Sequence, residues 1–266
     1  MITLYHNDMS SCAQKVRFAL TEKGIEWDGR HLNLRGGDQH QPDYMKLNPA
    51  GVVPTVVHNG GVVRESNVIM EYIDDLDAAN PLRPADPMNR ARMRLWMKRL
   101  DDRMHAETGV VSSGIAFRYQ KLAKGQEAAE KLVNDIPEPV KRERMRSITF
   151  DGTASPLFAT AILAFRDLIA DIETALEDHD WLAGDTFSLA DMAYAPYATR
   201  LDHLQLGGMW KPESRFAGWY ARIREKPGYQ TGTRLGKPSG QPAEIRTARP
   251  GIPEAQPERR CADTGS

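Results

Sequence analysis

The sequence predicts two domains, a mixed α/β domain followed by an all-helical one. Strand-like and helix-like segments alternate over residues 1–80. Three prolines then follow at 81, 84 and 87, where a chain is expected to change direction. From there to about residue 230, apolar residues recur at the helical spacing of three and four. We therefore place the domains at residues 1–80 and 87–235.

The composition is that of a soluble globular protein. Its 35 basic and 36 acidic residues give a net charge of −1, which attracts neither nucleic acid nor an anionic membrane over long range. The longest apolar run, Leu157 to Phe165, is too short to cross a bilayer, and a strand-like start at residue 2 argues against a signal peptide. Two cysteines, Cys12 and Cys261, cannot form a disulfide framework. We expect a cytoplasmic protein without nucleic-acid or membrane partners.

The first strand and helix meet at a pair of serines. Residues 2–5 alternate as a strand does, and apolar residues between Val16 and Leu20 recur at helical spacing. Ser10 and Ser11 therefore lie at or near the N-cap of the helix. A helix start offers unpaired N–H groups and about half a positive charge, so it favours a thiolate over its thiol. A serine there can also simply cap the helix.

The other elements of the first domain follow in order. We predict a strand over residues 27–34, a polar loop over 35–41, and a helix that begins at Ser66. Two short β-branched runs, 54–57 and 61–63, flank Asn59-Gly60. Asn and Gly tolerate positive φ, so this pair predicts a two-residue hairpin turn.

The second domain begins with a long helical stripe. Gly109 and Gly114 are expected to kink or end its first helix, because glycine is a poor helix former. Residues 125–153 are polar and contain two prolines, so we expect an irregular segment there. Apolar spacing then predicts another long helix around residues 162–176.

Two further patterns concern folding rather than chemistry. Ser188 and Asp191 form a capping box, in which each side chain accepts from the backbone N–H of the other residue. From residue 236 onward prolines and glycines accompany hardly any apolar residues. Such a composition cannot form a core, so we predict a disordered tail over 236–266.

Several motifs stand together in this chain: Ser10-Ser11-Cys12 with Lys15-Val16-Arg17, Leu47-Asn48-Pro49, Val52-Val53-Pro54, Glu65-Ser66 and the capping box. With these motifs, the chain resembles the cytosolic glutathione S-transferases over residues 1 to about 230. The resemblance implies a thioredoxin-like first domain, glutathione as co-substrate, a homodimer and no metal; the seven histidines show no paired spacing suited to a metal.

The resemblance also implies which residues bind glutathione. The proline matching Pro54 is cis in this family and turns the backbone of Val53 outward, where it pairs with the cysteinyl unit as an added strand would. Glu65 and Ser66 would hold the γ-glutamyl end at a helix start. Gln39 falls where related enzymes contact the glycine end, although a loop glutamine is usually only solvated.

Three neighbouring residues are candidates for the catalytic role. Lowering the pKa of the glutathione thiol by ~2 units requires ~2.7 kcal/mol of preferential thiolate stabilisation. A hydroxyl at a helix start can supply it. Ser10 is the first choice, because it matches the catalytic serine of the zeta class, and Ser11 is the alternative. Cys12 matches a cysteine of the zeta class and of reductive dehalogenases that forms a mixed disulfide with glutathione, but it can equally be a small core residue.

The substrate is expected to be a small aromatic electrophile. Residues 82–87, with the following Arg90-Ala91, most resemble bacterial lignin β-aryl etherases. The Ser-Ser-Cys motif instead resembles zeta-class and dehalogenase enzymes. We favour glutathione-dependent cleavage of a β-aryl ether, with Cys12 a spectator. Reductive dehalogenation, a zeta-type isomerisation and a non-catalytic binding module stay open as alternatives.

Overall fold

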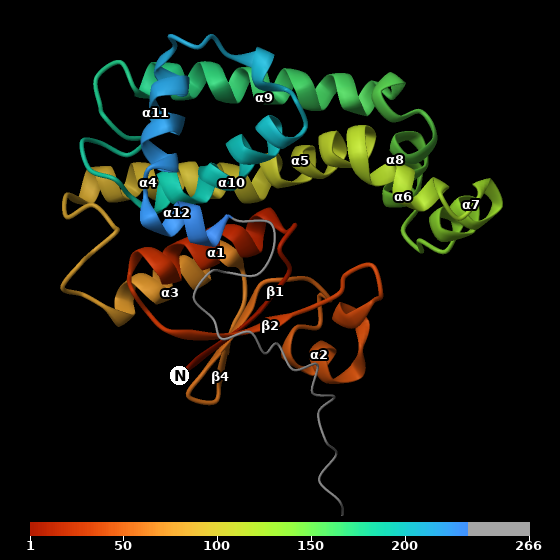
Figure 1. The fold of residues 1–266 in the computed structure, drawn as a ribbon, viewed down its shortest axis with the longest axis horizontal. Helices are drawn as coiled ribbons and strands as arrows, with labels where there is room; N and C mark the ends of the chain where they lie inside the picture. Colours follow the sequence, from red (N-terminus) through yellow and green to blue (C-terminus); the bar gives the residue numbers. More distant parts are fainter. Residues whose placement is uncertain (234–266) are drawn as a thin grey trace, which may run out of the picture.

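A mixed four-stranded sheet forms the base of the first domain in the computed structural model, which describes residues 1–233 (Figure 1). The strand order is β2-β1-β3-β4. Strand β1 (Ile2–His6) pairs in parallel with β2 (Trp27–His31) and antiparallel with β3 (Thr55–His58), which in turn pairs antiparallel with β4 (Gly61–Val63). The predicted tail over 236–266, with Cys261, lies outside the described residues.

The first domain confirms most of the predicted elements. The hairpin turn lies at Asn59-Gly60, where both residues have positive φ. Strand β2 ends three residues earlier than expected, at His31. A six-residue helix, α2 (Pro42–Leu47), was not predicted, because it buries only Tyr44 and is too short to show an apolar stripe.

Helices α1 (Ser11–Glu22) and α3 (Ser66–Leu76) lie between the sheet and the second domain (Figure 1). Both begin as expected, with Ser10 as the N-cap of α1 and Glu65 as the N-cap of α3. Their apolar residues are buried against the sheet and against helices of the second domain.

The second domain is helical throughout, so the predicted fold class is confirmed. One continuous helical stretch runs over residues 87–122 and includes π-helical turns at Leu100–Met104 and Ser113–Phe117. The helices are α4 (Pro87–Arg99), α5 (His105–Ser112), α6 (Arg118–Leu122), α7 (Gln126–Asn134), α8 (Pro139–Phe150), α9 (Pro156–Ala175), α10 (Leu189–His203), α11 (Arg215–Arg224) and α12 (Pro227–Gly232).

Two expectations for this domain are wrong. The first is that Gly109 or Gly114 ends the long helix. Gly109 lies inside α5, and Gly114 lies in the π-helical turn between α5 and α6, so the helical stretch continues past both. Packing against α9 outweighs the cost of a glycine, which is only about 1 kcal/mol. Residues 125–153 are not irregular, because they form α7 and α8. Pro139 begins α8 at its first position, and the Glu138 carboxylate accepts from two backbone N–H groups there.

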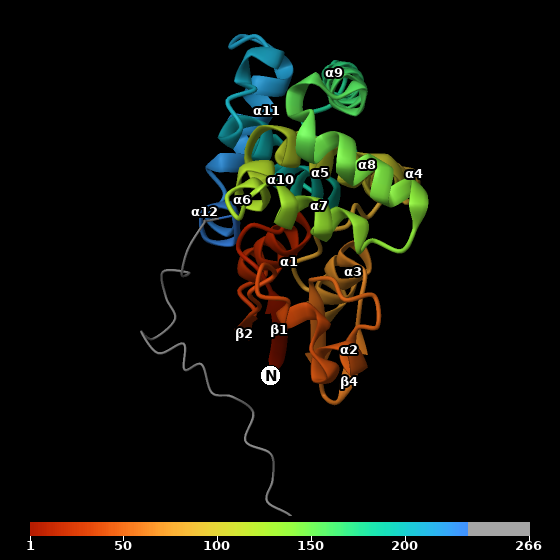
Figure 2. The same cartoon turned by 90° about the vertical axis from the view of Figure 1, so that its right-hand side faces the viewer.

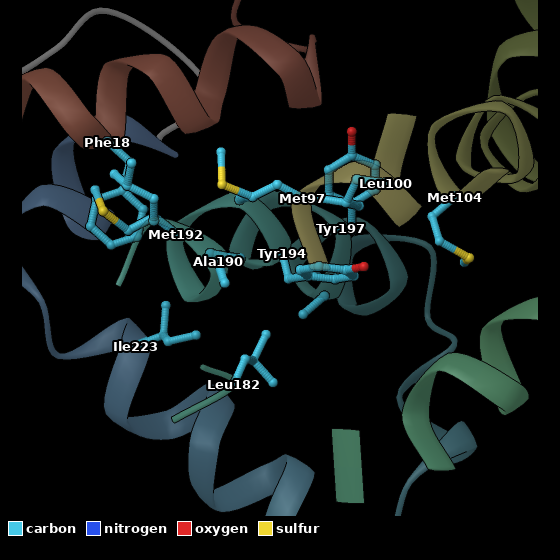
Figure 3. Close-up of a cluster of buried hydrophobic side chains, with 14 of the residues drawn as sticks. Phe18, Met97, Leu100, Met104, Leu182, Ala190, Met192, Tyr194, Tyr197 and Ile223 are labelled. Carbon is cyan, nitrogen blue, oxygen red and sulfur yellow. The ribbon is translucent and has the colours of Figure 1, made fainter. Parts of the chain in front are cut away.

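Helix α10 forms the centre of the core. Its residues from Leu189 to Leu201 are buried, and Figure 3 shows Tyr194 and Tyr197 among side chains of α1 and of the stretch that follows α4. The predicted capping box at its start is present. Asp191 also accepts from the indole of Trp219 at 2.9 Å.

The two domains meet mainly along α1. Helix α12 packs closely against it, since a Cβ added to Gly232 would lie 2.5 Å from the backbone nitrogen of Phe18. Helix α10 also packs against α1 and lies above it in Figure 2. This packing brings α5 and α10 to the start of α1. Among residues 1–233 no helix combines the length and apolarity needed to span a membrane.

Candidate active site

Ser10 begins α1 and has extended backbone geometry. Its hydroxyl accepts a hydrogen bond from the N–H of Ala13 at 3.2 Å. A serine hydroxyl can donate its proton while it accepts, so Ser10 can still donate to a bound anion. Ser11 is buried, and Cys12 is half-buried in the first turn.

The loop before Ser10 is fixed by side chains of its own domain. Asn7 accepts from the N–H of Met9 at 2.9 Å, and Gln14 donates to the carbonyl of Asp8 at 2.8 Å. Arg17 forms an ion pair with the Asp8 carboxylate at 2.5 Å. These contacts set where the Ser10 hydroxyl lies relative to the helix.

Cys12 faces two side chains of the helical domain. Its sulfur lies 3.5 Å from Nδ1 of His105, on α5, and 3.8 Å from the hydroxyl of Tyr197, on α10. The His105 nitrogen and the Tyr197 hydroxyl are 3.2 Å apart. Neither residue was predicted from the sequence, because they lie 93 and 185 positions from Cys12 and no spacing connects them to it.

This environment makes the Cys12 thiol acidic. Burial raises its pKa, but the hydrogen bond with His105 and the positive charge of Lys15 lower it more, so that the pKa of the Cys12 thiol falls to about 6. The same hydrogen bond raises the pKa of His105. The contact with His105 therefore favours the thiolate form of Cys12 near neutral pH.

Lys15 places a positive charge beneath the start of α1. It is fully buried, and its ammonium donates to the side-chain oxygen of Asn67 at 2.7 Å. Asn67 in turn donates to the carboxylate of Asp101 at 2.9 Å. Burial lowers the pKa of Lys15, while the nearby Cys12 and Asp101 raise it. The hydrogen bonds from Lys15 to Asn67 and from Asn67 to Asp101 therefore connect α1, α3 and the helical domain below the site.

The peptide bond between Val53 and Pro54 is cis, as the family resemblance implies. Tyr44 and Asn48 both donate to the carbonyl of Val52, at 2.5 and 2.9 Å. The unpredicted helix α2 and the Leu-Asn-Pro motif thus position this segment. Within residues 1–233 no hydrogen bond uses the backbone N–H or C=O of Val53.

Glu65 and Ser66 begin α3 next to the start of α1. Glu65 has φ of 63°, a conformation that costs a non-glycine residue about 1 to 3 kcal/mol and is often found at functional sites. Its side chain is exposed, whereas Ser66 is buried. The Ser66 hydroxyl lies close enough to Cys12 to help lower the pKa of the thiol.

Gln39 lies apart from that group, in a short turn before α2. Its amide nitrogen donates to the carbonyl of Leu34 at 3.2 Å, while its amide oxygen is buried without a partner among the described residues. No hydrogen bond among residues 1–233 joins Gln39 to Ser10 or Ser66. The structure therefore brings together the serines, Cys12 and Ser66, and leaves Gln39 on a separate loop.

The acidity of Cys12 can be tested by its reactivity. In a Cys261→Ser background, we expect the rate of alkylation by iodoacetamide to rise with pH around a midpoint near 6, because only the thiolate reacts. His105→Ala should move the midpoint upward, since it removes the largest lowering contact. His58→Ala, which removes a histidine bonded to Tyr72 at 2.8 Å, is the matched control and should leave it unchanged. A midpoint near the ordinary value of about 8.5 in the parent protein would contradict this environment.

Comparison with known proteins gives two family matches. The model described as glutathione S-transferase, N-terminal domain, matches residues 9–76. The model described as glutathione S-transferase, C-terminal domain, matches residues 154–222. One match therefore lies in each domain of the structure.

Individual relatives match over most of the chain. Protein LigF of Sphingobium sp. (strain NBRC 103272 / SYK-6) is 30% identical over 232 residues, covering 85% of this chain and 86% of LigF. The tetrachloro-p-hydroquinone reductive dehalogenase of Sphingobium chlorophenolicum is 24% identical over 237 residues, covering 86% and 94%.

Solved structures agree with the fold. The crystal structure of the beta-etherase LigF from Sphingobium sp. strain SYK-6 superposes with a TM-score of 0.74 at 27% identity, covering 87% of this chain and 98% of that chain. A theta-class glutathione S-transferase from Xanthomonas axonopodis pv. citri, solved with glutathione bound, gives a TM-score of 0.65 at 23% identity, with 88% and 98% covered.

Proposed function

The chain belongs to the glutathione S-transferase family, whose co-substrate is glutathione, and we propose that it uses the glutathione thiolate to cleave β-aryl ethers. In this proposal Ser10 donates a hydrogen bond to the glutathione sulfur. The positive end of α1 and the buried Lys15 add to the stabilisation of the thiolate.

The residues around this position suit the rest of glutathione. The unused N–H and C=O of Val53 can pair with the cysteinyl unit in the manner of an added strand. The start of α3 at Ser66, with the Glu65 carboxylate beside it, suits the two charged groups of the γ-glutamyl end. Gln39, whose amide oxygen has no partner among residues 1–233, would reach the glycine end.

The reaction follows from thiolate chemistry. The sulfur attacks the carbon that bears the aryloxy group, a C–S bond forms, and the C–O bond breaks. The electron pair of that bond leaves with the aryl oxygen as a phenolate, which takes a proton from water. A carbonyl on the adjacent carbon makes the attacked carbon more electrophilic. A phenol has a pKa near ~10, so it leaves as an anion far more readily than an alkoxide would.

One observation supports the ether substrate above the others. The similarity to beta-etherase LigF is 30% and extends over both domains, so it includes the helical domain that faces Ser10. The dehalogenase is similar over a comparable length at 24%. Glutathione S-transferase Z2 of Arabidopsis thaliana, at 34%, matches only 50% of this chain.

A substrate panel with glutathione present tests the proposal. We expect release of the phenol from an aryl ether β to a ketone, and little release from the matched compound with an alcohol in place of the ketone. A chlorinated hydroquinone and maleylacetoacetate should be poor substrates. Turnover of either one in preference to the ether would contradict the proposal. A protein that neither turns over any of them nor is retained on a glutathione column would be a non-catalytic module.

Reductive dehalogenation is a second candidate, favoured by the contact between Cys12 and His105. In that reaction a first glutathione displaces chloride and forms a thioether. The Cys12 thiolate then attacks the sulfur of that thioether. An S–S bond forms between Cys12 and glutathione, the C–S bond breaks, and the electron pair left on the aromatic carbon takes a proton, so that hydrogen replaces chlorine. A second glutathione releases Cys12 and yields glutathione disulfide, so two glutathiones are consumed per chloride.

The variant Cys12→Ser separates the two candidates. Ether cleavage does not use this thiol, so we expect the variant to retain most of that activity. Dehalogenation would lose its second step. If Cys12→Ser loses ether cleavage while circular dichroism shows that it is folded, the ether-cleaving mechanism is contradicted and a reaction through the Cys12 thiol is favoured.

We also propose that the protein forms a homodimer through α3 and α4. Arg94 of α4 pairs with Glu71 of α3 at 2.7 Å, so these helices lie side by side. Next to the pair, Val68 is 56% exposed and Leu95 is 71% exposed. Contiguous exposed apolar side chains can mark a subunit contact. The mass in solution tests the proposal, and a monomeric mass would contradict it.

A further inference from the structure

Arg200 is a buried cation that the proposed reaction does not use. It lies on α10, and its side chain is almost completely buried. Among residues 1–233 no carboxylate forms an ion pair with its guanidinium, and burial lowers its pKa. A buried charge without a counter-ion is costly unless its donors are satisfied and its position serves a purpose.

The contacts of Arg200 converge on the start of α1. One guanidinium nitrogen, Nη2, donates to the carbonyl of Met9 at 2.5 Å. The other, Nη1, donates to the hydroxyl of Ser112 on α5 at 3.0 Å. The guanidinium carbon lies 5.5 Å from the ring centre of Phe117, in the second π-helical turn. Helix α5 and the second π-helical turn therefore hold this side chain of α10 against one carbonyl of the first domain.

The Met9 carbonyl lies directly before the residue that caps α1. Met9 directly precedes Ser10, so the Met9 carbonyl belongs to the peptide unit that leads into the helix cap. The other contacts that fix residues 7–9, among them those made by Asn7, Gln14, Arg17 and His31, all come from the first domain. Within the described part of the chain, Arg200 supplies the hydrogen bond to this loop that comes from the helical domain.

We propose that Arg200 is a positioning residue for the thiolate site: it keeps the Ser10 hydroxyl aimed at the glutathione sulfur and places its own positive charge near that sulfur. The inference rests on the proposed function, in which Ser10 holds that sulfur. Misplacement of a catalytic group by about 1 Å can cost about 10²-fold in rate, so an anchor one residue from Ser10 has a measurable effect. A positive charge in a partly buried site also interacts strongly with a thiolate, because little water screens it.

The test compares variants that separate charge, hydrogen bonding and domain contact. Arg200→Met removes both the charge and the donors. Arg200→Lys keeps the charge and a donor, and Arg200→Gln keeps a donor without the charge. The matched control is Glu22→Ala, because Glu22 accepts from the N–H of Gly228 at 3.0 Å and thus joins the two domains at the opposite end of α1.

The ultraviolet absorbance of bound glutathione thiolate, followed against pH, is the main measurement. For Arg200→Met we expect the apparent pKa of the bound thiol to rise by about one unit, which corresponds to a tenfold lower thiolate fraction below that pKa. Turnover should fall about tenfold near neutral pH, with the loss shrinking as the pH rises, while the KM for glutathione changes little. Arg200→Lys should recover most of the shift, and Glu22→Ala should show none.

Each contrary outcome has a distinct meaning. Without a thiolate signal in the parent enzyme, the proposed function fails and this inference fails with it. A parent signal with an unchanged thiol pKa in Arg200→Met overturns the role of Arg200 alone. An equal shift of the thiol pKa in Glu22→Ala would mean that any lost contact between the domains has this effect, which also overturns the positioning role of Arg200. If Arg200→Met does not fold, Arg200→Gln decides, and an unshifted thiol pKa in that variant overturns the inference.

Discussion

Replacing Ser10 with alanine is expected to lower turnover about 100-fold, the size seen when one positioned donor to a developing or stabilised anion is lost. The affinity for glutathione should stay almost unchanged, because Val53, Glu65 and Ser66 would still bind the rest of the molecule. The apparent pKa of the bound thiol should rise, since the hydroxyl favours the thiolate over the thiol. Turnover, calorimetric affinity and thiolate absorbance together check this.

A matched control is needed because Ser10 also caps α1. Its hydroxyl accepts from Ala13 at 3.2 Å, and the loss of such a cap costs about 1 kcal/mol. Ser214 caps α11 in the same way, accepting from Ala217 at 3.2 Å. Ser214→Ala should therefore lose similar stability and keep full activity. An unchanged thiol pKa in Ser10→Ala would transfer the role to Ser11 or Cys12.

Asp191→Ala is expected to destabilise the protein by about 3 kcal/mol or more. The Asp191 carboxylate is fully buried and accepts from the N–H groups of Leu182 and Ser188, each at 3.0 Å, and from the indole of Trp219 at 2.9 Å. The Ser188 hydroxyl donates to the same carboxylate at 3.0 Å. Alanine would remove the partner of all four buried donors, at roughly 1 kcal/mol or more each. Urea unfolding followed by fluorescence and circular dichroism measures the loss.

Asp86 provides the comparison for this variant. It caps α4 by accepting from Asn89 at 2.8 Å, but its side chain is exposed, so water can replace the lost hydrogen bond. Asp86→Ala should cost only about 1 kcal/mol. Equal losses for the two variants would show that burial does not set the importance of Asp191.

Features that depend on neighbouring residues were predictable from the sequence. The start of α1 at Ser10, the hairpin at Asn59-Gly60 and the capping box at Ser188 each involve groups within a few residues of one another. Local chemistry decides such features, because capping hydroxyls and positive φ act over one turn. The fold class followed from the change in apolar spacing near residue 87.

Features that depend on distant contacts were not predictable in this way. Pro137 and Pro139 suggested an irregular segment. Instead, Pro139 begins α8, because Glu138 caps this helix and the helix packs against its neighbours. His105 and Tyr197 carry no motif of their own, and only the docking of the helical domain brings them to Cys12. The role proposed for Arg200 likewise depends on its hydrogen bond to the Met9 carbonyl in the other domain, which no sequence pattern indicates.

The central claim is that the glutathione thiolate displaces an aryloxide from carbon, and the product balance of the wild-type reaction tests it most directly. With a β-aryl ether ketone and excess glutathione, we predict one phenol and one glutathione thioether for each glutathione consumed, without accumulation of glutathione disulfide. Chromatography at successive times measures the amounts of phenol, glutathione thioether and glutathione disulfide. Absence of phenol release, or glutathione disulfide rising in step with it, would contradict the claim.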